Sequence, residues 1–340
     1  MKKLRITGIL LLFLTFTMLA ACGPGSDDKK DSDGQKVEKI KLGEVTRSVF
    51  YAPEYVALEK GFFKDAGLDV DLQTTWGGDK TMTALLSASV DIALVGSETS
   101  IYVHEQKPKD KVINFAQLTR TDGTFLVSKE ADPDFTWDKL KGSSFLGQRK
   151  GGMPQMVGEF VLKKNDIDPK TDLNLKQNID FANIPGAFVS GDDQYVQLFE
   201  PTASIFEKEG KGHILASFGE ASGEVPYTVF MAKESMLKKD AATIQKFTDA
   251  IYKAQQWVDA NDAKTIAKVI APYFEDTDVD MLAASINRYK EQGSYALDPL
   301  LKKDAWNNLK DIMDAAGELP GKAPYEELVN TDFAKKAMKK

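Results

Sequence analysis

The alternation of strand-like and helix-like segments constrains the fold of this chain more than any other feature of its sequence. Ile40 and Leu42 alternate with lysines as in a half-buried strand, and a helical pattern begins at Pro53. Residues 68–74 alternate again, a second helical pattern follows, and residues 91–96 form a nearly continuous apolar run. Such a run is typical of a parallel strand that is buried on both faces. The order predicts an α/β fold with a mainly parallel sheet and helices on each side.

The same order of segments starts again after residue 132, and the pattern becomes purely helical from Lys233. We expect a helix over residues 154–164 and strands at 111–118, 125–128, 144–147, 194–199, 213–218 and 227–231. The longest C-terminal helix begins at Asp240, which we expect to cap it. Its buried stripe comprises Ile244, Phe247, Ile251, Ala254 and Val258.

This organisation predicts two lobes, with the second inserted into the first. Lobe 1 comprises residues 37–128 and 230–340, and lobe 2 comprises residues 129–229. The chain then passes between the lobes near Ser128 and near Phe230, and two such connections form a hinge. The alternative is one large α/β domain.

The N-terminus has the pattern of an export signal. Three basic residues precede an apolar run that ends at Leu19-Ala-Ala-Cys22, and Cys22 is the only cysteine of the 340 residues. The run is too short to span ~30 Å of hydrocarbon, so we expect residues 1–21 to be removed. Residues 19–22 resemble the lipobox of bacterial lipoproteins, which implies a lipid on Cys22 and a location on the outer face of the cell membrane. An ordinary cleaved signal with a chance cysteine is the alternative. Residues 22–36 have no apolar anchor and are predicted to be a flexible tether.

The composition excludes several classes of function. Removal of the leader takes the formal net charge from −7 to −10, and no concentrated basic face remains for nucleic acid. The mature chain has no cysteine for a disulfide, a thiolate metal site or a nucleophile. His104 and His213 lie far apart in sequence without metal-ligand spacing. We therefore expect no catalytic residues, no metal and no cofactor.

Three glycine-containing turns are predicted to follow strands and to open helices. They are residues 75–80 (TWGGDK), 95–99 (VGSET) and 149–153 (RKGGM). Ligands of open α/β sheets bind outside the carboxyl ends of the strands, where such turns gather. Free N–H groups at the helix starts favour an anion or a carbonyl-like acceptor on the ligand.

Flat and charged side chains surround these turns. The flat ones are Phe50, Tyr51, Trp76, Phe199 and Tyr227, which suit a planar ligand, although Phe50 and Phe199 are equally consistent with the core. Among the acids, Asp79 fits a helix cap and Glu200 fits the turn before Pro201, whereas Glu98 suggests a ligand role. Arg149 and Lys150 could instead hold a sulfonate or a carboxylate. The residues alone leave both ligand classes open: a planar nitrogen heterocycle that donates to Glu98, or a small organic anion.

From about residue 37 to 338 the chain resembles the substrate-binding proteins of ABC importers, in the family that covers sulfonate, taurine, nitrate and thiamin-precursor binders. The resemblance lies in residues 50–70 (FYAPEYVALEKGFFKDAGLDV), 77–79 (GGD), 91–97 (DIALVGS) and 199–201 (FEP). It implies a periplasmic-binding-protein-like type II clamp with a discontinuous first domain. It also implies a monomer that delivers a small molecule to an ABC permease and its ATPase.

In that family the ligand contacts loops that match residues 49–51, 76–79, 96–98, 119–121 and 150–153. Combined with the reasoning above, this predicts ligand contacts at Phe50, Tyr51, Trp76, Gly77, Gly78, Asp79, Ser97, Glu98, Thr119, Arg149, Lys150, Gly152, Met153, Glu200 and Tyr227.

Two other classes remain. Related biosynthetic enzymes of the same fold carry cysteines that the mature chain lacks, which disfavours an enzyme. A surface sensor or scavenger without a transporter is the other alternative.

Overall fold

The structure, a computed structural model, describes residues 37–339. The predicted leader 1–21, the lipobox 19–22 with Cys22, and the tether 22–36 lie outside the described residues. Within residues 37–339, no helix is both long enough and apolar enough to cross a bilayer.

The first sheet has five strands in the order β2-β1-β3-β10-β4. The strands are β1 (Glu38–Glu44), β2 (Leu68–Thr74), β3 (Ile92–Gly96), β4 (Val112–Thr119) and β10 (Thr228–Lys233). β1 pairs in parallel with β2 and β3, and β10 is antiparallel to both β3 and β4. The apolar run at residues 91–96 forms β3, a central strand whose first four residues are buried, as its composition predicted.

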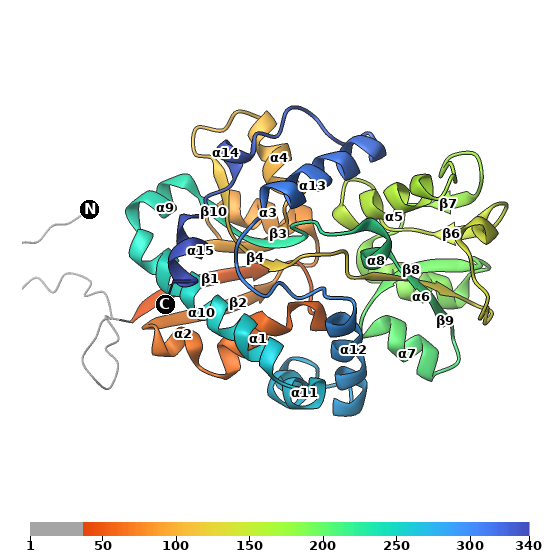
Figure 1. The fold of residues 1–340 in the computed structure, drawn as a ribbon, viewed down its shortest axis with the longest axis horizontal. Helices are drawn as coiled ribbons and strands as arrows, with labels where there is room; N and C mark the ends of the chain where they lie inside the picture. The colour runs from red at the N-terminus through yellow and green to blue at the C-terminus, as the bar shows by residue number, and fades with distance from the viewer. Residues whose placement is uncertain (1–36, 340) are drawn as a thin grey trace, which may run out of the picture.

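The second sheet also has five strands, in the order β7-β6-β8-β5-β9. The strands are β5 (Thr124–Ser128), β6 (Ser144–Leu146), β7 (Asn174–Lys176), β8 (Tyr195–Phe199) and β9 (His213–Ser217). β6 is parallel to β7 and β8, and β5 is antiparallel to β8 and β9. Figure 1 shows the two sheets side by side, each with its own helices. The α/β fold class predicted from the sequence is confirmed, but the expected mainly parallel sheet is wrong: both sheets are mixed, because β10 and β5 run antiparallel to their neighbours.

Strand β5 lies in a different lobe from the one that we expected. The predicted range of lobe 1, 37–128, included it, but both of its neighbours are strands of the second sheet. The chain therefore crosses between the sheets in the loop after Thr119 and returns before Thr228. We propose lobe boundaries at about residues 120–123 and 223–227, in place of Ser128 and Phe230.

Eleven α-helices of the described residues belong to the first lobe and four to the second. The α-helices of lobe 1 are α1 (Ala52–Glu59), α2 (Phe62–Asp65), α3 (Gly78–Leu86), α4 (Glu98–Glu105), α9 (Glu234–Lys239), α10 (Ala241–Ala260), α11 (Ala263–Ile270), α12 (Val279–Glu291), α13 (Lys303–Ala316), α14 (Tyr325–Leu328) and α15 (Asp332–Ala337). The α-helices of lobe 2 are α5 (Met153–Lys164), α6 (Ile184–Ser190), α7 (Thr202–Lys208) and α8 (Phe218–Ser222). Short 3₁₀ helices are η1 (Val49–Tyr51) and η4 (Ala271–Tyr273) in lobe 1, and η2 (Trp137–Leu140) and η3 (Phe181–Asn183) in lobe 2.

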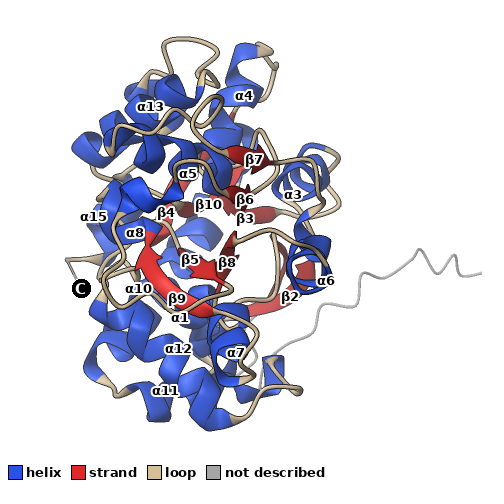
Figure 2. Cartoon of the chain, turned by 90° about the vertical axis from the view of Figure 1, so that its right-hand side faces the viewer, coloured by secondary structure: helices blue, strands red, loops and turns tan. Residues whose placement is uncertain are grey.

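The C-terminal helices connect the two lobes. α10 packs against α1 and α15 on the first sheet, and its predicted stripe from Ile244 to Val258 is buried. Asp240 occupies the N-cap position, but its side chain makes no capping hydrogen bond, so that prediction is wrong. α13 packs against α5 and α12 packs against α7, which joins lobe 1 to lobe 2 beside the hinge. Figure 2 shows α3 of lobe 1 and α6 of lobe 2 on one side of the molecule.

Candidate functional site

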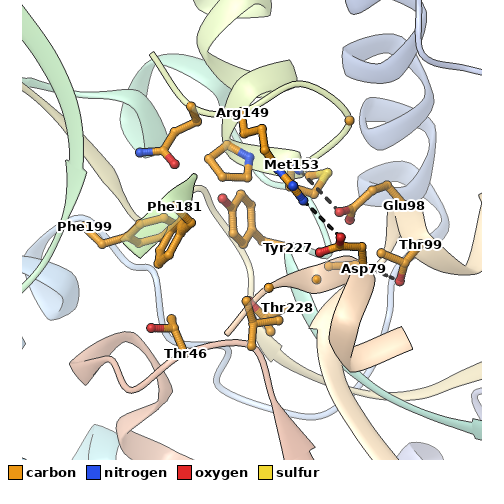
Figure 3. A pocket seen from close by; sticks show the side chains of 18 of the residues that line it. Thr46, Asp79, Glu98, Thr99, Arg149, Met153, Phe181, Phe199, Tyr227 and Thr228 are labelled. Atoms are coloured by element: carbon orange, nitrogen blue, oxygen red, sulfur yellow. Dashed lines mark hydrogen bonds and ion pairs between the residues drawn. The ribbon is translucent and has the colours of Figure 1, made fainter. Parts of the chain in front are cut away.

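A cavity of about 310 Å³ lies between the two sheets, near the carboxyl ends of their strands. Its walls come from both lobes (Figure 3). The lining residues are Val45, Thr46, Tyr51, Gly77, Gly78, Asp79, Gly96, Glu98, Thr99, Gln148, Arg149, Lys150, Gly151, Gly152, Met153, Pro154, Phe181, Phe199, Tyr227 and Thr228.

The three glycine-containing turns of the sequence meet at this cavity. The first leads from β2 into α3, the second from β3 into α4, and the third from β6 into α5. Gly77 has a φ of 146°, a backbone conformation that other residues rarely adopt. The three turns thus bring three helix starts to one cavity, two from lobe 1 and one from lobe 2.

Glu98 is the buried acid of the cavity wall. Its side chain lies over Gly96, where a Cβ would overlap the carboxyl group, so any larger residue at position 96 would displace that group. The Met153 N–H of lobe 2 donates to Glu98 Oε1 at 3.3 Å, and Oε2 has no hydrogen-bond partner. Burial raises the pKa of Glu98 to about 8, although backbone N–H groups of Glu98, Met153 and Thr99 oppose this rise.

Four aromatic rings also line the cavity. Tyr51 and Tyr227 come from lobe 1, and Phe181 and Phe199 come from lobe 2. The Phe181 and Phe199 rings lie 5.8 Å apart at 56°, and Figure 3 shows them beside the cavity with Tyr227 between them and Glu98. The Tyr227 hydroxyl is buried without a partner. Burial, and then the charge of Asp122, raises the pKa of Tyr227 well above its ordinary range.

An ion pair between the lobes lies at the edge of the cavity. Arg149 of lobe 2 lies 3.1 Å from Asp79 of lobe 1 and 3.6 Å from Asp180. Burial opposes the charge of Asp79, but the hydrogen bond and the charge of Arg149 outweigh it and lower the Asp79 pKa. About half of each side chain is exposed, so the pair contributes modestly to stability.

Ten of the fifteen residues predicted from the sequence line the cavity. They are Tyr51, Gly77, Gly78, Asp79, Glu98, Arg149, Lys150, Gly152, Met153 and Tyr227. The structure brings these residues together. Their contact with a ligand remains a prediction.

Four of the other predicted residues lie behind or beside the cavity. Phe50 is buried among aromatic rings, with the Tyr289 centroid 5.0 Å away. Ser97 donates its hydroxyl to the Pro226 carbonyl, and the Thr119 hydroxyl accepts from the Thr228 N–H. Trp76 is 53% exposed, has a φ of 60° and does not line the cavity.

Glu200, the fifth, belongs to a buried polar cluster, here called the Glu200 cluster (Glu200, Ser204, Ser285 and Arg288). Its carboxylate accepts from the Ser204 N–H at 2.9 Å and from the Ser204 hydroxyl at 2.7 Å. Arg288 Nε lies 2.9 Å from Glu200 Oε1. These contacts tie the start of α7 to α12, which is a structural role.

Several lining residues were missed. Thr46 follows β1 at the same sheet edge as the predicted turns, so its position after a strand could have identified it. Gln148, Phe181 and Thr228 come from segments without a motif. Gln148 is held by donating to the Gln197 carbonyl at 2.6 Å, a contact across 49 residues that no local pattern indicates.

Within residues 37–339, no group of three or more His, Cys, Asp or Glu side chains is arranged to hold a metal ion. The unpartnered groups of the cavity, Glu98 Oε2 and the Tyr227 hydroxyl, are suited to hydrogen bonds with an organic ligand.

Comparisons with known proteins agree with this architecture. The model of the NMT1-like family matches residues 33–271. "Putative binding protein YtlA" of Bacillus subtilis (strain 168) is 62% identical over 325 residues, covering 96% of this chain and 94% of YtlA.

Two solved structures share the fold at low identity. The alkanesulfonate-binding protein SsuA of Xanthomonas axonopodis pv. citri, bound to MOPS, has a TM-score of 0.70 at 14% identity, covering 86% of this chain and 98% of SsuA. A ligand-binding component of an ABC-type import system from Staphylococcus aureus, with zinc bound, has a TM-score of 0.68 at 16% identity, covering 88% of this chain and 99% of that one. The predicted clamp fold is confirmed.

Proposed function

The chain belongs to the NMT1-like family, and we propose that it is the solute-binding component of an ABC importer, closing its two lobes on one small organic molecule. The observation that carries the proposal is the cavity between the sheets, whose walls come from both lobes. A ligand there stabilises closure through contacts that form only when both lobes touch it. The closed form then delivers the molecule to a membrane permease with its ATPase.

The relatives support binding over catalysis. The chain is a binding protein and not an enzyme, in keeping with its family and with the name of its 62% identical relative. The import role is supported by the fold that it shares with a component of an ABC-type import system. A scavenger without a transporter would also bind a solute, so binding alone does not test import. Deletion of the gene should abolish uptake of the bound solute in the native cell. Normal uptake after the deletion would contradict an import role.

The ligand that we propose is a planar nitrogen heterocycle, such as a thiamin-related aminopyrimidine. Four aromatic rings and an unpartnered carboxyl oxygen suit a flat molecule that donates hydrogen bonds. A sulfonate or another small organic anion is the second candidate, because Arg149 and Lys150 line the cavity. It is less favoured because Arg149 already pairs with Asp79 and Asp180.

A thermal-shift screen separates the two candidates. A ligand at 100 times its Kd adds about 2.7 kcal/mol to the free energy of unfolding. We expect stabilisation by an aminopyrimidine panel and none by alkanesulfonates or taurine, and the reverse result would establish the second candidate. X-ray scattering should show a smaller radius of gyration with the stabilising compound; identical radii would contradict closure.

We further propose that Cys22 carries a lipid that holds the protein on the extracytoplasmic face of the membrane. The lipobox-like residues 19–22 support this. Two or more acyl chains anchor a protein durably, whereas one does not. Cys22→Ala should move the protein from the membrane fraction to the soluble fraction, and an unchanged distribution would favour an ordinary signal peptide.

A further inference from the structure

One carboxyl group takes part in both the cavity wall and the contact between the lobes. Glu98 is the first residue of α4 in lobe 1, and Met153 is the first residue of α5 in lobe 2. The Met153 N–H donates to Glu98 Oε1 at 3.3 Å, so the carboxyl lies at two helix starts at once. A helix start is the position that an anionic group of a ligand would occupy. The protein fills this position with its own acid.

The second oxygen of this carboxyl group distinguishes Glu98 from the other charged residues that line the cavity. Only 4% of Glu98 is exposed, and Oε2 has no hydrogen-bond partner. Burying an ionised carboxylate without a partner for one oxygen costs free energy, and the protein can avoid the cost only by neutralising or pairing the charge.

The groups around Glu98 do not neutralise it. Tyr51 from η1, Tyr227 from β10 and Tyr102 from α4 itself all feel its charge, and each has a raised pKa, chiefly through burial. α5 presents a backbone N–H. The charged lining residues are Asp79, Arg149 and Lys150, and Arg149 is engaged by Asp79.

We propose that Glu98 makes closure of the lobes conditional on a ligand that brings a nitrogen-bound hydrogen to Oε2. This rests on the proposed solute-binding function and narrows its ligand to planar, basic nitrogen compounds. In the empty clamp the charged carboxylate opposes closure, since closing removes it from water. A ligand N–H that donates to Oε2 removes that penalty. An oxyanion is rejected because the carboxyl group already occupies the two helix starts.

When no ligand is bound, protonation of Glu98 can remove the cost of burying its charge. Opening returns Glu98 to water, where its pKa approaches the ordinary 4.5, whereas in the closed form the pKa is about 8. Closure of the empty protein therefore takes up a proton, and each pH unit between these values shifts the equilibrium toward the open form by up to about tenfold. When a neutral base binds, the Oε–H bond breaks and an N–H bond forms on the ligand; when a cation binds, the proton leaves to solvent.

The ligand-free protein tests this directly. Labels on Leu86→Cys in α3 and Val189→Cys in α6 report the distance between the lobes, because both positions are exposed and lie in different lobes. Cys22→Ser in the full chain leaves the labels as the only thiols. We expect the closed population of the otherwise unchanged protein to fall as the pH rises from 5 to 9, and Glu98→Gln to flatten this dependence.

Two other buried acids provide the controls. Glu54 is buried in lobe 1 with both oxygens unpartnered, and the charges that act on it, Glu44 and Arg47, belong to the same lobe, so Glu54→Gln should retain the pH dependence. Asp122 at the hinge has a pKa raised by burial to about 6, so it can add a pH dependence of its own to every variant. The contribution of Glu98 is therefore measured as the difference in pH dependence between the parent protein and Glu98→Gln. Equal pH dependence in the parent protein and in Glu98→Gln would overturn the proposal.

A second arm uses small probes at pH 8. Benzamidine and 4-aminopyrimidine should increase the closed population of the parent protein, and benzenesulfonate should not. Glu98→Gln should bind both bases at least tenfold more weakly than the parent protein, as measured by the concentration that closes the lobes. Closure by benzenesulfonate, failure of both bases, or an unchanged response of Glu98→Gln would overturn the proposal.

Native mass spectrometry after exposure to cell extract separates this inference from the solute-binding function. A captured solute without an N–H donor would overturn the inference and leave the binding function intact. Capture of no solute, with the Glu98-dependent pH response present, would overturn the binding function alone.

Discussion

Glu98 in the cavity wall and Glu200 in the Glu200 cluster are both buried carboxyl groups, but they differ in their hydrogen-bond and ion-pair partners. Glu200 is hydrogen-bonded by Ser204 and paired with Arg288, whereas Glu98 has no cation beside it, Oε1 accepts from the Met153 N–H, and Oε2 has no partner. Burial raises the pKa of both groups. The difference teaches that burial alone does not identify a functional acid. An acid is available to a ligand where it both lines the cavity and has an oxygen without a partner, as Glu98 does.

The largest expected effect on stability comes from removing the ion pair between Arg288 and Glu200. Arg288→Met leaves Glu200 buried without its cation, and removing one member of a buried ion pair is strongly destabilising. Because Arg288 is partly exposed, we expect a loss of about 3 kcal/mol in the free energy of unfolding, measured by urea denaturation. Arg288→Lys, which keeps the charge, should lose less. A loss below about 1 kcal/mol for Arg288→Met would mean that the cluster is not held by this pair.

Matched amide substitutions sharpen the comparison, because they should change stability in opposite directions. Glu200→Gln loses an ion pair and should destabilise by about 1–3 kcal/mol. The folded-state pKa of Glu98 is raised, so its stabilising contribution is present below pH 4.5 and is lost as the pH rises to about 8. Glu98→Gln should therefore be more stable than the parent protein at pH 9, by about 1–3 kcal/mol, and not at pH 4.5. Denaturation curves at pH 4.5, 7 and 9 measure this; the same sign for both variants at pH 9 would break the comparison.

A smaller effect is expected at the edge of the cavity. Asp79→Asn removes an exposed ion pair between the lobes and should cost about 0.2–1 kcal/mol at low salt. The difference from the parent protein should disappear in high salt, since exposed charges are screened. Thermal unfolding at two salt concentrations measures it. A larger loss that persists in high salt would show that Asp79 has a buried role like that of Glu200.

The smallest effect is expected at Trp76. Trp76→Asn removes an exposed ring from a left-handed backbone position that asparagine tolerates, so stability should change by less than about 1 kcal/mol. Affinity for the compound identified in the thermal-shift screen should be unchanged in a calorimetric titration. A tenfold loss would return Trp76 to the binding site.

Most of the fold could be predicted because its signals are local. Period-two patterns identify β1 and β2, the apolar run identifies β3, and a single stripe identifies α10. The lobe of β5 could not be predicted in this way. Its pairing with β8 and β9 joins residues about 70 to 90 positions away, and nothing in residues 124–128 encodes that choice.

The site was predictable where it consists of turns, and unpredictable where it depends on orientation. Strand ends gather at one edge, so the glycine turns could be assigned together. Phe50 and Tyr51 are neighbours on η1, yet only Tyr51 lines the cavity, because the other ring packs against Tyr289. The surroundings of Glu98 and Glu200 depend on residues far away in sequence. The sequence suggested a ligand role for Glu98 and a turn for Glu200, but it could not show which partners each carboxyl group would have.

The position of β10 has a consequence for the order in which the chain assembles. β10 lies between β3 and β4 in the first sheet, although it follows the whole second sheet in sequence. Until residues 228–233 are available, β4 has no neighbour in its sheet, and β3 presents an unpaired edge. The second sheet is continuous between residues 124 and 217 and can form first. Lobe 1, which begins the chain, is therefore the last to be completed, and a nascent chain emerging N-terminus first carries an exposed strand edge until lobe 2 has emerged.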